Sequence, residues 1–200
     1  GVTRIFINHL IGFALGEVSS LLLEGSRSYE IVLHDYYAAC PGITLLRYDN
    51  SYCGGERDSR RCNACLALGT SARVPLPAND RRLPIEVWRT QFAAILAKAS
   101  RVHTCSEEQR ELLSRYFPQQ HFEQVDFSYL ERPDLTFQDE FAFRNPPTVA
   151  VIGAIGQHKG SDIVYWLEEA IRRRTLNIRL VVIGYTDREQ EPRVSHQGRF

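Results

Sequence analysis

One pattern constrains the fold of this 200-residue chain more than any other: a buried strand, a glycine-bearing loop and a helix in succession. Residues 148–152 form an apolar, β-branched run, which is typical of a strand covered on both faces. A loop over 153–160, a helix capped by Ser161 or Asp162, and a second buried strand over 178–183 follow. This order favours parallel strands joined by a right-handed crossover, so the sequence predicts an α/β fold. The apolar stripe of the helix is predicted at Ile163, Trp166, Leu167, Ala170 and Ile171.

The same alternation of strands and helices is predicted upstream. Strands are expected over 4–8, 29–33, 101–104 and 121–127, and helices over 15–24, 84–98 and from a capping box at Ser106 to Pro118. The second of these helices has a predicted apolar stripe of Ile85, Trp88, Phe92, Ile95 and Leu96. Residues 40–80 show no sustained period and are predicted to be an irregular, Cys-rich insertion. Proline-containing residues 129–147 are predicted to link a part over 1–128 to a part over 148–200.

Charge and hydropathy exclude several classes of protein. Lys and Arg together number 24, as do Asp and Glu, so the chain has no net charge. It therefore has no general electrostatic attraction to nucleic acid or anionic lipid. No apolar run reaches the roughly 18–20 residues of a transmembrane helix. The chain begins Gly1-Val2, contains no Met and carries no targeting signal, so we expect an internal segment of a longer protein.

Cysteine usage indicates a reducing compartment. Four of the five cysteines lie within residues 40–65, and Cys105 stands apart, just before a predicted helix, where we expect a structural role. An odd count in a chain that can build a core argues against a disulfide scaffold, so we expect a cytoplasmic protein.

The clustered cysteines suggest a structural zinc site. Cys62 and Cys65 form a Cys-x2-Cys knuckle, and Cys53 and Cys40 can complete a tetrahedral set, with His34 a competing fourth ligand. Zinc would explain how a polar insertion keeps its shape without a core. The alternative is that Cys62 and Cys65 are a reducible pair and Cys40 a buried apolar residue.

Polar residues at one predicted strand end are candidates for a ligand crevice. His34-Asp35 closes the 29–33 strand, and the carboxyl ends of parallel strands face the ligand. His9 follows the preceding strand and can line the same crevice. The alternative for each histidine is a ring satisfied by backbone partners.

The loop over 153–160 is a candidate phosphate site. A helix N-terminus offers unpaired N–H groups, Gly156 and Gly160 let a phosphate approach, and Lys159 adds a charge, so we expect the amides of 156–160 to face a common anion. The loop matches neither the dinucleotide-binding nor the P-loop pattern. The alternative is a glycine-bearing turn with a solvated lysine.

Several short motifs resemble those of the retaining glycosyltransferases of family four (group 1 type), which have two Rossmann-like lobes. Those enzymes carry Gly-Arg-x4-Lys-Gly after the first strand of the C-terminal lobe; Gly153, Lys159 and Gly160 match its spacing, and Ala154 replaces the arginine. Stretches 7–10 and 33–41 look like the end of the family's N-terminal lobe, and some members carry a similar Cys-rich insertion. The resemblance covers most of the chain.

The resemblance implies a GT-B-like pair of lobes, both incomplete here, and retaining transfer of a sugar, of hexosyltransferase type, in polysaccharide biosynthesis. His34 would lie near the donor sugar as the catalytic residue, and Gly153, Gly156, Lys159 and Gly160 would bind the diphosphate of a nucleotide-sugar donor. Transfer would need no metal, so any zinc at Cys40, Cys53, Cys62 and Cys65 would be structural. The acceptor would be a glycan or lipid-linked glycan, with peripheral membrane contact. The first strands and a Glu-x7-Glu region are missing, so we expect no turnover by this segment alone.

A second class of function competes with this one. The insertion could be a zinc-stabilised interaction surface or a nucleic-acid-binding module on an α/β scaffold. A nucleic-acid reader should carry a basic stripe, but acidic residues dilute the arginines of the insertion. We therefore expect no nucleic-acid partner.

Overall fold

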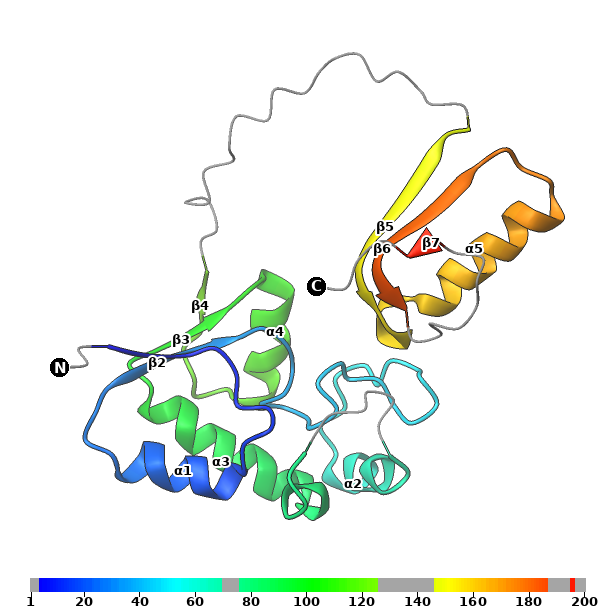
Figure 1. Cartoon of the computed structure of the whole chain (residues 1–200). Coiled ribbons are helices and arrows are strands. Elements are labelled where there is room, and N and C mark those ends of the chain that lie inside the picture. The colour runs from blue at the N-terminus through cyan, green and yellow to red at the C-terminus, as the bar shows by residue number, and fades with distance from the viewer. Residues whose placement is uncertain (1–3, 70–75, 126–145, 187–194, 197–200) are drawn as a thin grey trace. The chain divides into compact units, whose positions relative to one another are not determined.

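The chain divides into two α/β units, Gly1–Leu130 and Glu131–Phe200 (Figure 1). The structure, a computed structural model, describes residues 4–69, 76–125, 146–186 and the backbone of 195–196. Both units contain a parallel sheet with connecting helices, which confirms the α/β part of the predicted fold class. Most of the linker predicted over 129–147 falls outside the described residues.

Unit 1 contains a four-stranded parallel sheet whose strands follow chain order. The strands are β1 (Ile5–Ile7), β2 (Tyr29–Leu33), β3 (Arg101–Thr104) and β4 (Glu123–Gln124). The helices between them are α1 (Leu15–Glu24), α3 (Ile85–Lys98) and α4 (Glu107–Tyr116). All seven elements were predicted, with β1 and β4 shorter than expected.

One core lies between this sheet and its helices. The five predicted stripe residues of α3 are all buried in it, which confirms the helical phase. Trp88 is fully buried, donates from Nε1 to the Tyr37 carbonyl at 2.8 Å, and meets the Tyr37 ring edge-on at 4.9 Å between ring centroids. A buried indole paired in this way satisfies its one donor and fixes the turn after β2 against α3.

The insertion contains a helix that the sequence analysis missed, α2 (Ser59–Ala67), besides a single turn η1 (Asp80–Arg82). Asp58 caps α2 by accepting from the Arg61 amide at 2.9 Å. No residue of α2 is buried, so this helix has no hydrophobic core of its own. It lies beside α3 in Figure 1.

Two helices of unit 1 begin with caps supplied from far along the chain. Ala14 and Pro84 precede α1 and α3 and offer no side-chain cap. Instead Asp80 accepts from the Leu15 amide, and Asn63 accepts from the Ile85 amide, both at 2.8 Å. The insertion is therefore tied to the helices by the backbone groups that helix ends leave unsatisfied.

Unit 2 is a smaller parallel sheet with one covering helix. It comprises β5 (Thr148–Ile155), the turn η2 (Gln157–Lys159), α5 (Ser161–Arg173), β6 (Arg179–Thr186) and β7 (Ser195–His196). The sheet order is β5-β6-β7, all parallel. The predicted strand–helix–strand unit is confirmed.

Two details of unit 2 differ from the predictions. Val164 packs against Ile155 and Val182, with Leu167 and Ile171 at helical spacing from it, so Ile163 and Trp166 fall outside the buried face and are about two-thirds exposed. Among the described residues β5 is also covered on one face only, since Ile152 is 69% exposed.

No helix in the described ranges has both the length and the apolar character needed to cross a membrane.

Candidate functional site

Four polar residues of unit 1 lie at the carboxyl ends of the neighbouring strands β1, β2 and β3. β2 ends at Leu33, as predicted, so His34 and Asp35 begin the connection that leaves the sheet. His9 follows β1, and Cys105 follows β3. Because these strands are parallel and adjacent, the four residues lie along one edge of the sheet.

His9 and Asp35 are locked to each other and to the backbone. Nε2 of His9 lies 2.9 Å from Oδ2 of Asp35, and Nδ1 accepts from the Ile11 amide at 2.8 Å. The acceptor role of Nδ1 places the neutral ring's proton on Nε2, so Nε2 donates to the carboxylate. Oδ1 of Asp35 accepts from the Tyr37 amide at 2.8 Å. His9 is therefore a satisfied histidine with no free ring nitrogen, but it also lines a small pocket together with His34 and Asp35, as predicted.

His34 has the opposite character. Its ring is exposed, and Nδ1 lies 3.8 Å from the Cys105 sulfur. Nε2 has no hydrogen-bond partner among the described residues. Burial raises the pKa of the Cys105 thiol, and Asp35 raises it further, so the sulfur stays protonated at neutral pH. Of the two histidines, His34 is the one that can contact a ligand.

Gln109 holds this edge together and was missed as a site residue. It is buried, donates from Nε2 to the Asp35 carbonyl at 3.0 Å, and accepts at Oε1 from the Cys105 amide at 2.8 Å. The predicted capping box is confirmed on its Ser106 side, since Oγ accepts from the Gln109 amide. The capping pattern located Gln109 at the helix start, but not its contact with Asp35 in the connection after β2.

The loop of unit 2 is shorter than predicted because β5 continues through Gly153 to Ile155. Gly153 has φ of +124° and pairs with Gly184 at +129° on β6. A Cβ at Gly184 would lie 2.2 Å from the Gly153 carbonyl oxygen. Gly153 is therefore part of a bend shared by two strands, and the loop itself begins at Gly156.

Two of the five amides predicted to face a common anion, those of Lys159 and Gly160, bond instead to carbonyls of the loop, and so does the next amide, that of Ser161. Those of Lys159 and Ser161 donate to the Gly156 carbonyl, at 2.9 and 3.2 Å, and that of Gly160 donates to the Gln157 carbonyl at 3.1 Å. Gly160, at φ of +81°, makes the left-handed turn into α5. What the loop offers an anion is the exposed ammonium of Lys159, which forms no ion pair within the described part of the chain.

Four cysteines surround one cavity of about 450 Å³ in the insertion. Its lining includes Cys40, Cys53, Cys62 and Cys65, with the side chains of Arg47 and Arg61. All five cysteines are unpaired thiols. In the described ranges no three His, Cys, Asp or Glu side chains lie close enough to hold a metal in their present positions. His34 contacts Cys105 and does not line this cavity.

Burial keeps the thiols of Cys40 and Cys62 protonated. It raises the pKa of Cys40 to about 11, and the neighbouring Cys62 and Cys53 add to the shift. Burial also raises the pKa of Cys62, and the nearby Arg89 opposes that rise.

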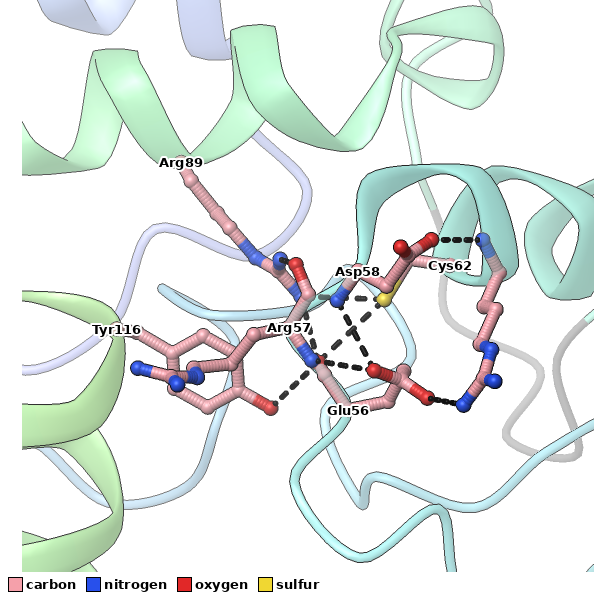
Figure 2. A network of polar contacts seen from close by, with 7 residues as sticks. Glu56, Arg57, Asp58, Cys62, Arg89 and Tyr116 are labelled. Carbon is pink, nitrogen blue, oxygen red and sulfur yellow. Dashed lines mark hydrogen bonds and ion pairs between the residues drawn. The ribbon is translucent and has the colours of Figure 1, made fainter.

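Arg89 links α3 to the insertion through hydrogen bonds, as Figure 2 shows. Its guanidinium donates to three backbone carbonyls, at 3.0 to 3.2 Å, and to the Cys62 sulfur at 3.3 Å. The guanidinium also stacks on the Tyr116 ring, 4.6 Å from its centroid, and the Tyr116 hydroxyl donates to the Glu56 carbonyl. The three carbonyls that accept from the Arg89 guanidinium are those of Ala39, Glu56 and Arg57.

Comparisons with protein families, with curated proteins and with solved structures found no match to this chain.

Proposed function

We propose that this protein is a retaining glycosyltransferase that binds a nucleotide-sugar donor. The observation that carries the proposal is the turn between β5 and α5, which places the exposed ammonium of Lys159 at the start of a helix after a parallel strand. A phosphate at a helix N-terminus gains from the helix dipole, and a lysine adds a full charge. The motif resemblance favours a diphosphate over other anions.

We propose that His34 contacts the donor sugar, as the catalytic residue of unit 1. Its position at the carboxyl end of β2, its exposure and its unpartnered Nε2 support this role. His9 and Asp35 would act as positioning residues, because their hydrogen bonds hold the backbone on which His34 is mounted. The transfer would proceed at the anomeric carbon, with the nucleoside diphosphate leaving and an acceptor hydroxyl of a glycan or lipid-linked glycan replacing it.

In this reaction Lys159 would stabilise the charge that develops on the leaving diphosphate. Gly156 and Gly160 would let the phosphates approach the backbone. Gly153 would act indirectly, because its bend in β5 sets the direction in which the strand enters the phosphate-binding loop. No metal is needed for this step. The odd cysteine count supports a cytoplasmic location, where nucleotide sugars are made and used.

Calorimetric binding of nucleoside diphosphates tests the phosphate site. We expect Lys159→Ala to weaken binding of uridine, guanosine or adenosine diphosphate, whichever the protein accepts, by one to two powers of ten, because a charged hydrogen bond contributes about 1.5–3 kcal/mol. The matched nucleoside should bind Lys159→Ala as well as it binds the unaltered protein. The control is Lys98→Ala, since Lys98 bonds to the Leu23 and Gly25 carbonyls in unit 1.

The same titrations with nucleotide sugars test His34. His34→Ala should weaken binding of the nucleotide sugar about three- to tenfold, the contribution of one neutral hydrogen bond, and leave binding of the diphosphate unchanged. Equal losses for nucleoside and diphosphate in Lys159→Ala, or no nucleotide binding by folded protein, would refute the proposal. Salt-dependent RNA or DNA binding instead would favour the non-catalytic module.

A further inference from the structure

The half-buried guanidinium of Arg89 on α3 contacts the insertion and forms no ion pair within the described ranges. The guanidinium of Arg89 is surrounded by three carbonyl oxygens and one sulfur. No carboxylate among the described residues lies within ion-pair distance of it, although arginines nearby, such as Arg61, do have one. Carbonyls supply dipoles and no charge, and charges taken out of water are normally paired. Only the sulfur of Cys62 could become an anion in this shell.

The guanidinium of Arg89 donates to the Cys62 sulfur at 3.3 Å, the geometry in which it would stabilise a thiolate. A bound metal ion removes the proton from a thiol outright. A metal would therefore convert Cys62 into the negative partner that Arg89 lacks.

The other ligands for such a metal surround the same cavity. Cys40, Cys53 and Cys65 line it with Cys62, and Cys62 and Cys65 lie three residues apart on one face of α2. The Cys40 sulfur already accepts a hydrogen bond from the Gly42 amide at 3.4 Å. N–H donors to two sulfurs are the outer-shell contacts that orient metal-bound thiolates. Four thiolates favour zinc over harder cations.

We propose that Cys40, Cys53, Cys62 and Cys65 bind one zinc ion, with Arg89 as a positioning residue for Cys62. The thiols are not yet at ligating distance of a common point, so binding draws them together across the cavity and releases their four protons. Four thiolates and Zn²⁺ carry two net negative charges, which Arg89 and the cavity-lining Arg47 can offset.

Zinc would add stabilisation to an insertion whose hydrophobic packing is limited. No residue of α2 is fully buried, although its partly buried Cys62 and Leu66 pack against the core of unit 1. The binding free energy of a structural zinc contributes directly to the folding of the segment it closes. The ion would thus fix α2, and with it the Asn63 cap on α3.

The test begins with the unaltered protein, purified without chelator. We expect about one equivalent of zinc, and cobalt substitution should give the intense absorption of a tetrahedral thiolate site. In the native state a thiol reagent should react with Cys105 alone, and with all five thiols after a chelator and denaturant are added. These measurements need no variant that might misfold.

Variants then assign the ligands and the role of Arg89. Cys53→Ser and Cys62→Ser should lose the zinc, whereas Cys105→Ser, the matched control, should keep it. Arg89→Met should lower zinc affinity 10- to 100-fold in competition with a chromophoric chelator, as outer-shell changes do, and the exposed control Arg82→Met should not. Protein without metal whose five thiols all react freely, or a Cys62–Cys65 disulfide in fresh protein, would overturn the proposal. None of these readouts depends on nucleotide binding.

Discussion

Replacing Asp80 should destabilise unit 1 because this carboxylate completes a helix 65 residues away. Asp80 is 4% exposed and accepts from the Leu15 amide at 2.8 Å. Leu15 is itself 2% exposed, so water cannot replace a lost acceptor there. Ala14, the residue before α1, has no oxygen in its side chain to take over.

The expected magnitude follows from these contacts. Asp80→Ala removes a helix cap and leaves a buried N–H unsatisfied, which together should cost about 2–3 kcal/mol in the free energy of unfolding. Asp80→Asn keeps an acceptor oxygen but loses the negative charge at a helix N-terminus. That change should cost about 1 kcal/mol or less.

Urea unfolding followed by tryptophan fluorescence measures the effect. Trp88 is fully buried in unit 1, so its emission reports the unfolding of that unit, whereas Trp166 is already 68% exposed and should change little. The control is Asp49→Ala, because Asp49 is exposed and bonds only within its own turn to Ser51. A loss in Asp80→Ala no greater than in Asp49→Ala, or equal losses in the Ala and Asn variants, would refute the reasoning.

Two further predictions concern the sheets. Hydrogen bonds from Arg4 and His103 lower the pKa of Glu30 to about 2, so Glu30 stabilises the fold above its ordinary pKa of 4.5 and this contribution is lost as pH falls toward 2. The urea midpoint should decline over that range in the unaltered protein and decline less in Glu30→Gln. Gly184→Ala should destabilise unit 2 by at least about 3 kcal/mol, measured by hydrogen exchange in β6, since it adds a backbone clash to a strained φ. The comparison variant is Gly12→Ala in unit 1, where φ is +86° and the added Cβ would lie in open space. This change should lower the free energy of unfolding by only about 1–2 kcal/mol.

The sequence predicted the elements of unit 1 well because their signals are local. The stripe of α3 repeats at helical spacing, and the Ser106–Gln109 pair marks the start of α4 within four residues. Such patterns need no knowledge of distant contacts.

The sequence-based predictions were wrong where a distant contact decides the structure, or where side chains are less buried than their spacing suggests. The Asp58 cap is a local signal for α2, but the apolar face of this helix is limited to Cys62 and Leu66, too short a pattern for periodicity to detect. Ile163 and Trp166 were placed in a core that in unit 2 is too small to include them.

The candidate site was predicted in part. The strand end at His34 and the lysine turn at Lys159 were found, because strand order and glycine position are readable from sequence. The acceptor role of His9 Nδ1 toward Ile11, and the cluster of acceptors around Arg89, depend on backbone conformation that no residue pattern specifies.

The remote caps on α1 and α3 also have a consequence for the order of folding. Asp80 can reach Leu15 only after the intervening 64 residues have formed a closed loop, and closing so long a loop is entropically costly. The first turn of α1 should therefore form after the transition state, on the downhill side of the barrier. Stopped-flow kinetics of Asp80→Ala should show faster unfolding and an almost unchanged refolding rate, which would make this contact a determinant of how long the folded protein persists.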